Sequence, residues 1–115
     1  MQAEDLRLFI PSLNFQESSR FYEALGFNKT EVNDELAIFV NGGVTFFLQN
    51  HFNQEFAQNL MMQLIVKDIQ AALNTIQQIK DITFKFEPIK QEHWGKVIYL
   101  WGPAGELWHI TELNS

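Results

Sequence analysis

The segment Asn14–Gln49, NFQESSRFYEALGFNKTEVNDELAIFVNGGVTFFLQ, reads as one helix followed by three strands. Asn14 is a suitable N-cap with Glu17 three residues later, and Gly26 suits the left-handed position that ends a helix. The turn sequences ND and NGG then predict two hairpins. We expect these strands at Phe27–Val32, Leu36–Val40 and Val44–Gln49. Because Leu6–Ile10 is a short apolar run before the helix, the N-terminal part predicts a βαβββ module.

The same order of elements recurs after a polar connection at residues 50–60, which has at most a helical turn. Met61–Val66 predicts a strand, and Asp68 caps a helix whose apolar stripe is Ile69, Ala72, Leu73, Ile76 and Ile79. Further strands are expected at Phe84–Phe86, Lys96–Trp101 and Leu107–Thr111. Gly43–Leu48 also aligns in sequence with Gly105–Ile110, which indicates a duplication. We therefore expect one α+β domain over residues 1–115, with halves at about 1–50 and 61–115.

Composition narrows the classes of function. The 115 residues are 46% hydrophobic and carry a formal net charge of −6, which fits one globular core and disfavours nucleic acid as a partner. A cationic or neutral small molecule suits this charge better. The chain contains no cysteine, so thiolate catalysis and zinc–cysteine sites are excluded. The acidic N-terminus and the lack of a long apolar run predict a cytoplasmic protein without a membrane partner.

Two motifs carry a resemblance to a known superfamily. Phe21-Tyr22-Glu23-Ala24-Leu25-Gly26-Phe27 and Gly102–Ile110, GPAGELWHI, resemble the glyoxalase, bleomycin-resistance and extradiol-dioxygenase superfamily, also called vicinal oxygen chelate proteins. The resemblance covers essentially the whole chain. Val44–Phe47 and Glu92–Gly95 look most similar to the bleomycin-resistance proteins. The resemblance implies one glyoxalase/bleomycin-resistance-like domain, in which mixed sheets curve around a ligand groove and the helices lie outside.

Enzymes of this superfamily hold a divalent metal with His or Glu side chains from strands one, four, five and eight. The resemblance places these positions at about Arg7, Phe47, Met61 and His109, of which only His109 is a ligand type. His51 and His93 lie in predicted loops without a second ligand at a recognisable spacing. We therefore expect no metal and no other cofactor.

Strand alternation predicts which side chains line the groove. His109 shares a face with Leu107 and Thr111, and the matching set in the first half is Thr45, Phe47 and Gln49. Aromatic, amide, hydroxyl and imidazole groups together suit a planar organic ligand. Met61, Phe39 and Trp101 are further candidate contacts. A structural role in the core or at an interface remains open for Trp101, Tyr99, Trp108 and His109.

Trp94 lies in the expected link between the sixth and seventh strands. In bleomycin-resistance proteins a tryptophan of this loop stacks on the flat part of the drug, so the resemblance implies the same role here. The alternative is that Trp94 packs under the loop or at a dimer contact. The family's opposing aromatic, early in strand three, is Leu36 in this chain, which favours a different flat ligand. Asp34, Glu35 and Glu92 are the acids expected at the groove rim, where they would attract a cation.

Proteins of this resemblance form symmetric dimers in which the first strand can be exchanged at the position of Pro11. A homodimer with two shared grooves is therefore expected. The function predicted is a metal-free binding protein that sequesters a flat, cationic antibiotic-like compound and has no catalytic residue. The alternatives are a metal-dependent glyoxalase-type lyase, isomerase or dioxygenase, and a metal-free enzyme that uses His109 or a carboxylate as a general base.

Overall fold

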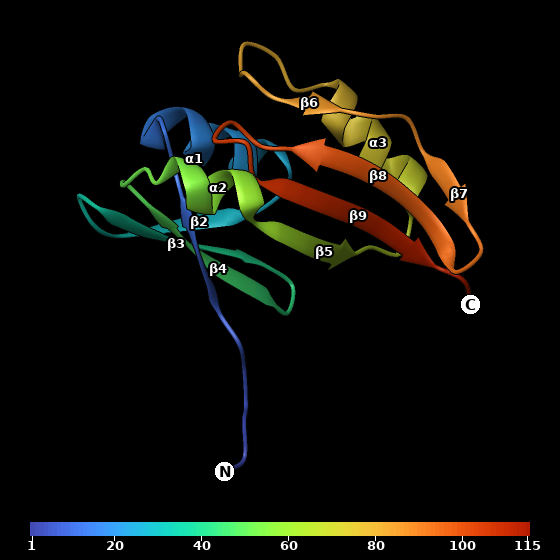
Figure 1. Ribbon diagram of the computed structural model, residues 1–115, viewed down its shortest axis with the longest axis horizontal. Coiled ribbons are helices and arrows are strands. Elements are labelled where there is room, and N and C mark those ends of the chain that lie inside the picture. The colour runs from blue at the N-terminus through green and yellow to red at the C-terminus, as the bar shows by residue number, and fades with distance from the viewer.

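The computed structural model describes residues 1–115 and contains two successive modules, a βαβββ module followed by a second one with an additional short strand after its helix (Figure 1). The first module consists of β1 (Leu8–Pro11), α1 (Phe15–Ala24), β2 (Asn28–Asn33), β3 (Leu36–Asn41) and β4 (Val44–Gln49). After α2 (Gln54–Asn59), the second consists of β5 (Met61–Ile65), α3 (Ile69–Gln77), β6 (Lys85–Phe86), β7 (Lys90–Glu92), β8 (Gly95–Trp101) and β9 (Leu107–Leu113). The α+β class and the duplicated order of elements are confirmed.

Each module forms its own mixed sheet. Sheet A has the strand order β1-β4-β3-β2, and sheet B has the order β5-β9-β8-β6, with β7 also paired to β8. The first strand of each sheet runs parallel to the last strand, and all other pairs are antiparallel. Strands β1 and β5 are therefore equivalent edge strands, each unpaired on one side.

The helix starts follow from the predicted caps. The side chain of Asn14 accepts a hydrogen bond from the Glu17 amide at 3.0 Å, and that of Asp68 accepts one from the Ala71 amide at 3.1 Å. These bonds satisfy amides that have no partner inside the first helical turn. Gly26 follows α1 with φ of 109°, a conformation that favours glycine.

Two local predictions are incomplete. The connection after β4 contains a full short helix, α2, because the Asn53 side chain accepts a hydrogen bond from the Phe56 amide at 2.9 Å. The expected link before β8 contains β7, which pairs with β8 through the register Lys90↔Val97. Its alternation is too short to be recognised in the sequence.

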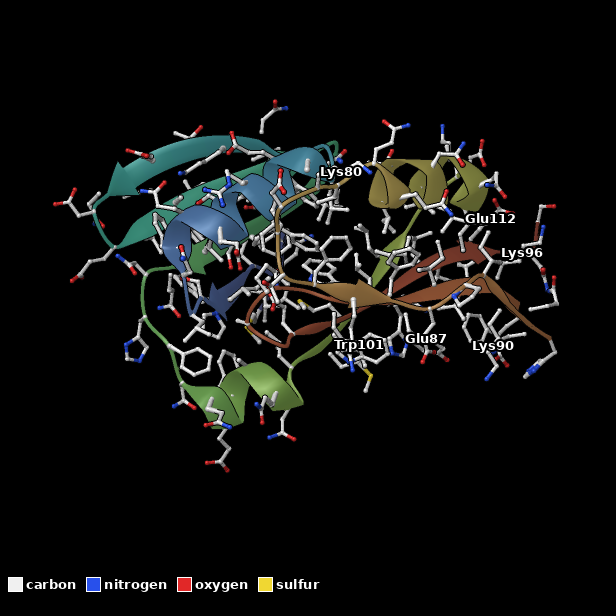
Figure 2. The ribbon with its side chains drawn as sticks, turned by 90° about the horizontal axis from the view of Figure 1, so that it is seen from above. Lys80, Glu87, Lys90, Lys96, Trp101 and Glu112 are labelled. Carbon is white, nitrogen blue, oxygen red and sulfur yellow. The ribbon has the colours of Figure 1, made fainter.

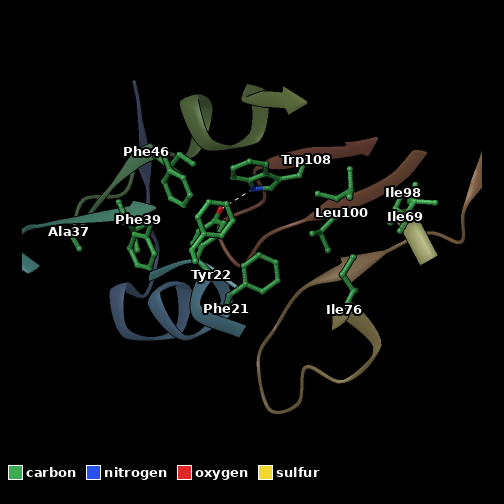
Figure 3. Packing of buried hydrophobic residues seen from close by; sticks show 14 residues of the cluster. Phe21, Tyr22, Ala37, Phe39, Phe46, Ile69, Ile76, Ile98, Leu100 and Trp108 are labelled. Atoms are coloured by element: carbon green, nitrogen blue, oxygen red, sulfur yellow. Dashed lines mark hydrogen bonds between the residues drawn. The ribbon is translucent and has the colours of Figure 1, made fainter. Parts of the chain in front are cut away.

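Both modules contribute to one core. Fourteen buried residues form the cluster: Ile10, Phe21, Tyr22, Phe27, Ala37, Phe39, Phe46, Leu48, Ile69, Ile76, Ile98, Leu100, Trp108 and Ile110. Tyr22 lies near its centre, with its ring 4.8 Å from that of Phe46 and 5.7 Å from that of Trp108 (Figure 3). Because Phe46 and Trp108 belong to different sheets, the ring of Tyr22 packs against both halves.

A buried chain of hydrogen bonds connects the halves through the same tyrosine. The Trp108 indole nitrogen donates to the Tyr22 hydroxyl at 3.0 Å, and that hydroxyl donates to a carboxylate oxygen of Glu106 at 2.5 Å. The other Glu106 oxygen accepts from the Ala104 amide at 2.9 Å. Burial, together with the Glu106 charge, raises the pKa of Tyr22 well above 10.0, so the hydroxyl keeps the proton that it donates.

The Glu106 carboxylate also explains a glycine in the turn before β9. A Cβ atom at Gly102 would lie 2.5 Å from the carboxyl carbon of Glu106, which is fully buried. The side chain of residue 106 therefore occupies the space that any larger residue at position 102 would need.

Replacing Tyr22 by Phe should remove both hydrogen bonds of this chain while retaining the ring. The Trp108 N–H loses its acceptor and the Glu106 carboxylate loses one donor, so we expect the free energy of unfolding to fall by about 1–3 kcal/mol in urea titrations. Tyr99→Phe is the control, because Tyr99 is only partly buried, and it should cost less than about 0.5 kcal/mol. Equal losses in the two variants would contradict this role of Tyr22.

The stability of the fold should depend on pH through Glu106. Burial raises the pKa of Glu106 above its ordinary value of 4.5, against the opposing effect of its hydrogen bonds. The folded state therefore holds this proton more tightly than the unfolded state does. Stability should decrease as pH rises from about 4.5 through the folded-state pKa. Glu106→Gln should show a constant offset without this slope in urea titrations at several pH values, and an unchanged slope would contradict the assignment.

The N-terminal residues extend away from the body of the molecule (Figure 1). Leu6 is 92% exposed, and the Arg7 side chain bonds only Asp5 at 3.1 Å. None of the helices is long and apolar enough to cross a membrane.

Candidate functional site

Each sheet buries one face in the core and leaves the other face uncovered. Alternate residues of β3 and β4, such as Ala37, Phe39 and Phe46, are buried, and the residues between them are more exposed. We call the uncovered side of sheet A open face A. It is formed by Phe9, Leu36, Ile38, Val40, Thr45, Phe47 and Gln49.

A stacked aromatic pair lies on open face A. The rings of Phe9 and Phe47 are parallel within 12° with centroids 4.5 Å apart, because these residues are directly opposite in β1 and β4. Phe9 is 44% exposed, and Ile38 is the neighbour of Phe47 on β3. None of the residues on this face carries a charge. Open face A is therefore an uncharged surface that suits the flat side of a ring.

The uncovered side of sheet B is more polar, and we call it open face B. It comprises Met61, Gln63, Ile65, Tyr99, Trp101, Leu107, His109 and Thr111. His109 lies opposite Gln63 on β5 and opposite Tyr99 on β8, and the Tyr99 ring meets the imidazole edge-on at 4.8 Å. These groups place one imidazole, one amide and one phenol hydroxyl side by side.

Thr111 is the least accessible residue of this set. It is fully buried, its hydroxyl donates to the His109 carbonyl at 3.1 Å, and it accepts from Gln63 at 3.4 Å. The Thr111 hydroxyl therefore already has a partner both as donor and as acceptor.

Trp101 is the last residue of β8 and lies at the end of open face B opposite Leu107. The Lys85 ammonium lies 4.5 Å from the centre of the indole, a cation–π contact. Figure 2 shows Trp101, Glu87 and Lys90 on the side of sheet B that is turned away from α3. Charged side chains therefore flank the uncharged centre of this face along β6 and β7.

The predicted groove residues fall into two sets within one chain. Leu36, Thr45, Phe47 and Gln49 lie on open face A, and Met61, Trp101, Leu107, His109 and Thr111 belong to open face B. Phe39 belongs to neither and its predicted ligand contact is wrong, because it is fully buried and stacks on Phe46 at 5.4 Å. The odd-and-even alternation of β3 places it on the core side.

Trp94 occupies the tight turn between β7 and β8 rather than a longer loop. Its carbonyl accepts a hydrogen bond from the Asn114 amide at 3.1 Å, and its side chain is partly buried. This hairpin is at the far end of sheet B from sheet A (Figure 1). Within one chain, Trp94 therefore does not oppose the Phe9–Phe47 pair.

The acids predicted at the rim have different surroundings. Asp34 and Glu35 are exposed in the turn between β2 and β3. Glu92 is 3.4 Å from the Lys90 ammonium, which offsets its charge.

Several residues on or beside the open faces were not predicted as ligand contacts: Phe9, Ile38, Gln63 and Tyr99 on the faces, and Lys85 beside Trp101. The same alternation that identified Phe47 and His109 would have found Phe9 and Gln63 once the register of β1 and β5 was known. That register depends on pairing between residues distant in the sequence.

The fold has known counterparts. A bleomycin-binding protein in complex with bleomycin superimposes with a TM-score of 0.78 at 18% identity, over 97% of this chain and 100% of the other. TnmS3, an antibiotic binding protein from Streptomyces sp. CB03234, gives 0.80 at 18% identity over 99% of each chain. This chain has the bleomycin-resistance fold.

The resemblance to the vicinal oxygen chelate superfamily is thus confirmed as a resemblance of fold. The fosfomycin resistance protein FosX from Listeria monocytogenes, in complex with Mn(II) and sulfate, has the same fold with a TM-score of 0.80 at 8% identity, covering 99% and 93% of the two chains. No family model and no curated protein sequence matches the chain. Because an antibiotic-binding protein and a fosfomycin resistance protein in complex with Mn(II) share this fold, the side chains must decide the chemistry.

The residues of this chain do not fit a divalent metal. Arg7 precedes β1, and the residue opposite Phe47 on β1 is Phe9; the residue opposite His109 on β5 is Gln63 rather than Met61. Two phenyl rings, one amide and one imidazole do not form a ligand set for such a metal. No three His, Asp or Glu side chains come together anywhere in the chain.

We expect Mn²⁺, Zn²⁺ or Ni²⁺ to leave the melting temperature of the untagged protein unchanged, because binding to the folded state alone would raise it. Elemental analysis should find only substoichiometric metal. A near-stoichiometric divalent metal that resists dialysis would contradict the absence of a ligand set.

Proposed function

We propose that this protein binds a flat, cationic, antibiotic-like small molecule without making or breaking a covalent bond. The observation that carries this proposal is the uncovered Phe9–Phe47 stack on a sheet face that contains no charge and no metal-ligand set. Such a surface offers apolar area for affinity, and the polar groups of open face B offer orientation. The antibiotic-binding proteins that share the fold support the same class of function.

The binding groove is proposed to form between two copies of the chain. Within one chain the two open faces do not oppose each other, and both include exposed apolar side chains: Phe9 and Val40 on open face A, and Met61 and Ile65 on open face B. A symmetric dimer that places face A of one copy over face B of the other would cover these side chains and bring Trp94 toward the groove.

Exchange of the first strand is compatible with this dimer. In the single chain, β1 pairs with β4 of the same chain, while residues 1–7 extend from the body (Figure 1). Pro11 ends β1, and the same register could form with a partner's β4. The swap is part of the proposed assembly, not a requirement for the shared groove.

The cationic charge of the ligand is proposed from the net charge of −6, which attracts cations to the molecule as a whole. The exposed acids Asp34 and Glu35 add to this field, whereas Lys85 and Lys90 oppose it locally at sheet B. The flat part of the ligand would therefore meet the uncharged centre of the groove, and its charged part would lie toward the rim.

The test is a tryptophan fluorescence titration with copper-free bleomycin and a panel of cationic planar compounds. We expect saturable quenching by at least one compound. Trp94→Phe and Phe47→Leu should weaken binding, since aromatic stacking contributes about 0.5–1.5 kcal/mol beyond buried area. Phe56→Leu is the matched control, because Phe56 is exposed on α2 outside both open faces.

No response to any compound, or equal weakening by Phe56→Leu, would contradict binding at the open faces. Sedimentation should show a dimer. A monomer that still binds would retain the ligand proposal and eliminate the shared groove.

A further inference from the structure

A separate cavity lies between the two halves, on the helix side of sheet B. Its volume is about 320 Å³, and it is lined by Leu25, Asn41, Leu64, Val66, Lys67, Asp68, Ala71, Ala72, Thr75, Ile76 and Ile110. None of these residues belongs to either open face. Leu25 and Asn41 come from the first half, so this open cavity is formed only because the two modules pack together.

The space exists because of small side chains on α3. The apolar stripe of this helix contains Ala72 between Ile69 and Ile76, and Ala71 also lines the cavity. Ile76 is 1% exposed and Ile110 is 3% exposed, so the floor is part of the hydrophobic core, near Ile76 in Figure 3. An apolar group that entered would therefore replace water on a surface that already belongs to the core.

The rim is polar but carries no net charge. Lys67 and Asp68 contribute one charge of each sign, and the Asp68 carboxylate already accepts the Ala71 amide. Lys67 has no carboxylate within ion-pair distance. Asn41 is exposed at the rim and offers an amide donor and acceptor. A ligand of either charge would meet one like charge and one opposite charge at this rim and would gain no net attraction, so the rim favours an uncharged ligand with one hydrogen-bonding group.

We propose that this cavity is a second binding site, for a compact, uncharged aromatic molecule that carries one hydroxyl or amide group. The ring lies on Ile76, Ile110 and Leu64, and the polar group bonds the Asn41 amide at the rim. The volume is at the lower end of the range for small-molecule sites, and a position between two packed units is typical of them. The site is independent of the sheet faces that are proposed to bind the cationic ligand.

Para-ethylphenol is the probe, with para-ethyltoluene, which lacks the hydroxyl group, as its partner. In two-dimensional amide NMR of the full chain, para-ethylphenol should shift the signals of residues lining the cavity, such as Leu25, Ala72 and Ile110, and leave those of Phe47 and His109 in place. Para-ethyltoluene should bind the same residues more weakly. Shifts at the open faces alone, or no saturable shift with para-ethylphenol, would overturn the proposal.

Ala72→Leu fills the cavity and should weaken para-ethylphenol binding by about tenfold or more, with an unchanged or higher melting temperature. Gln77→Leu adds the same side chain to an exposed position of α3 and should leave binding unchanged. Asn41→Ala should abolish the preference for para-ethylphenol over para-ethyltoluene without preventing binding. Unaltered binding in Ala72→Leu would overturn the proposal, whatever the outcome at the sheet faces.

Discussion

The arrangement of the whole molecule depends on the buried hydrogen bonds from Trp108 to Tyr22 and from Tyr22 to Glu106. They connect a helix of the first module to the last strand of the second. A buried carboxylate without a basic partner is costly unless donors surround it. Tyr22 and the Ala104 amide supply those donors, and only a native placement of the two halves provides both. The polar chain thus adds directional specificity to a core whose other contacts are apolar.

Joining the modules through their helix-covered sides leaves the opposite side of both sheets uncovered. The buried rings of Phe39 and Phe46 and the stacked rings of Phe9 and Phe47 come from the neighbouring strands β3, β4 and β1 of sheet A, and strand alternation places the two pairs on opposite faces. One set supplies hydrophobic stability and the other supplies a surface for recognition. The same division in sheet B buries Trp108 and leaves Trp101 partly exposed beside Lys85.

The comparison with FosX, whose structure contains Mn(II), shows that a shared backbone fold does not determine whether a metal can bind. FosX and this chain share the fold at 8% identity. In this chain, phenylalanine occupies the facing positions of β1 and β4, and only His109 remains as a ligand type on the facing strands of sheet B. Phenyl rings at these positions form a stacking surface and cannot serve as metal ligands, although the strand geometry is shared.

Local sequence determined most of the elements of this protein. Neighbouring residues determine the caps at Asn14 and Asp68, the turn glycines and the alternation of β4 and β9. These features can therefore be predicted from the sequence without a structure. The repeated order of elements also predicted the two modules and placed Phe47 and His109 on uncovered faces. The missed elements, α2 and β7, are short, and local periodicity is weakest there.

Only the tertiary structure decided which distant residues meet. The pairing of Phe9 with Phe47 and of Gln63 with His109 depends on the register of parallel strands, which are separated by a helix and further strands in the chain. Tertiary contacts likewise decide the Tyr22–Glu106 bond and the cavity beside Ala72. These features arise from contacts between the two halves or between their strands, and no local pattern encodes such contacts.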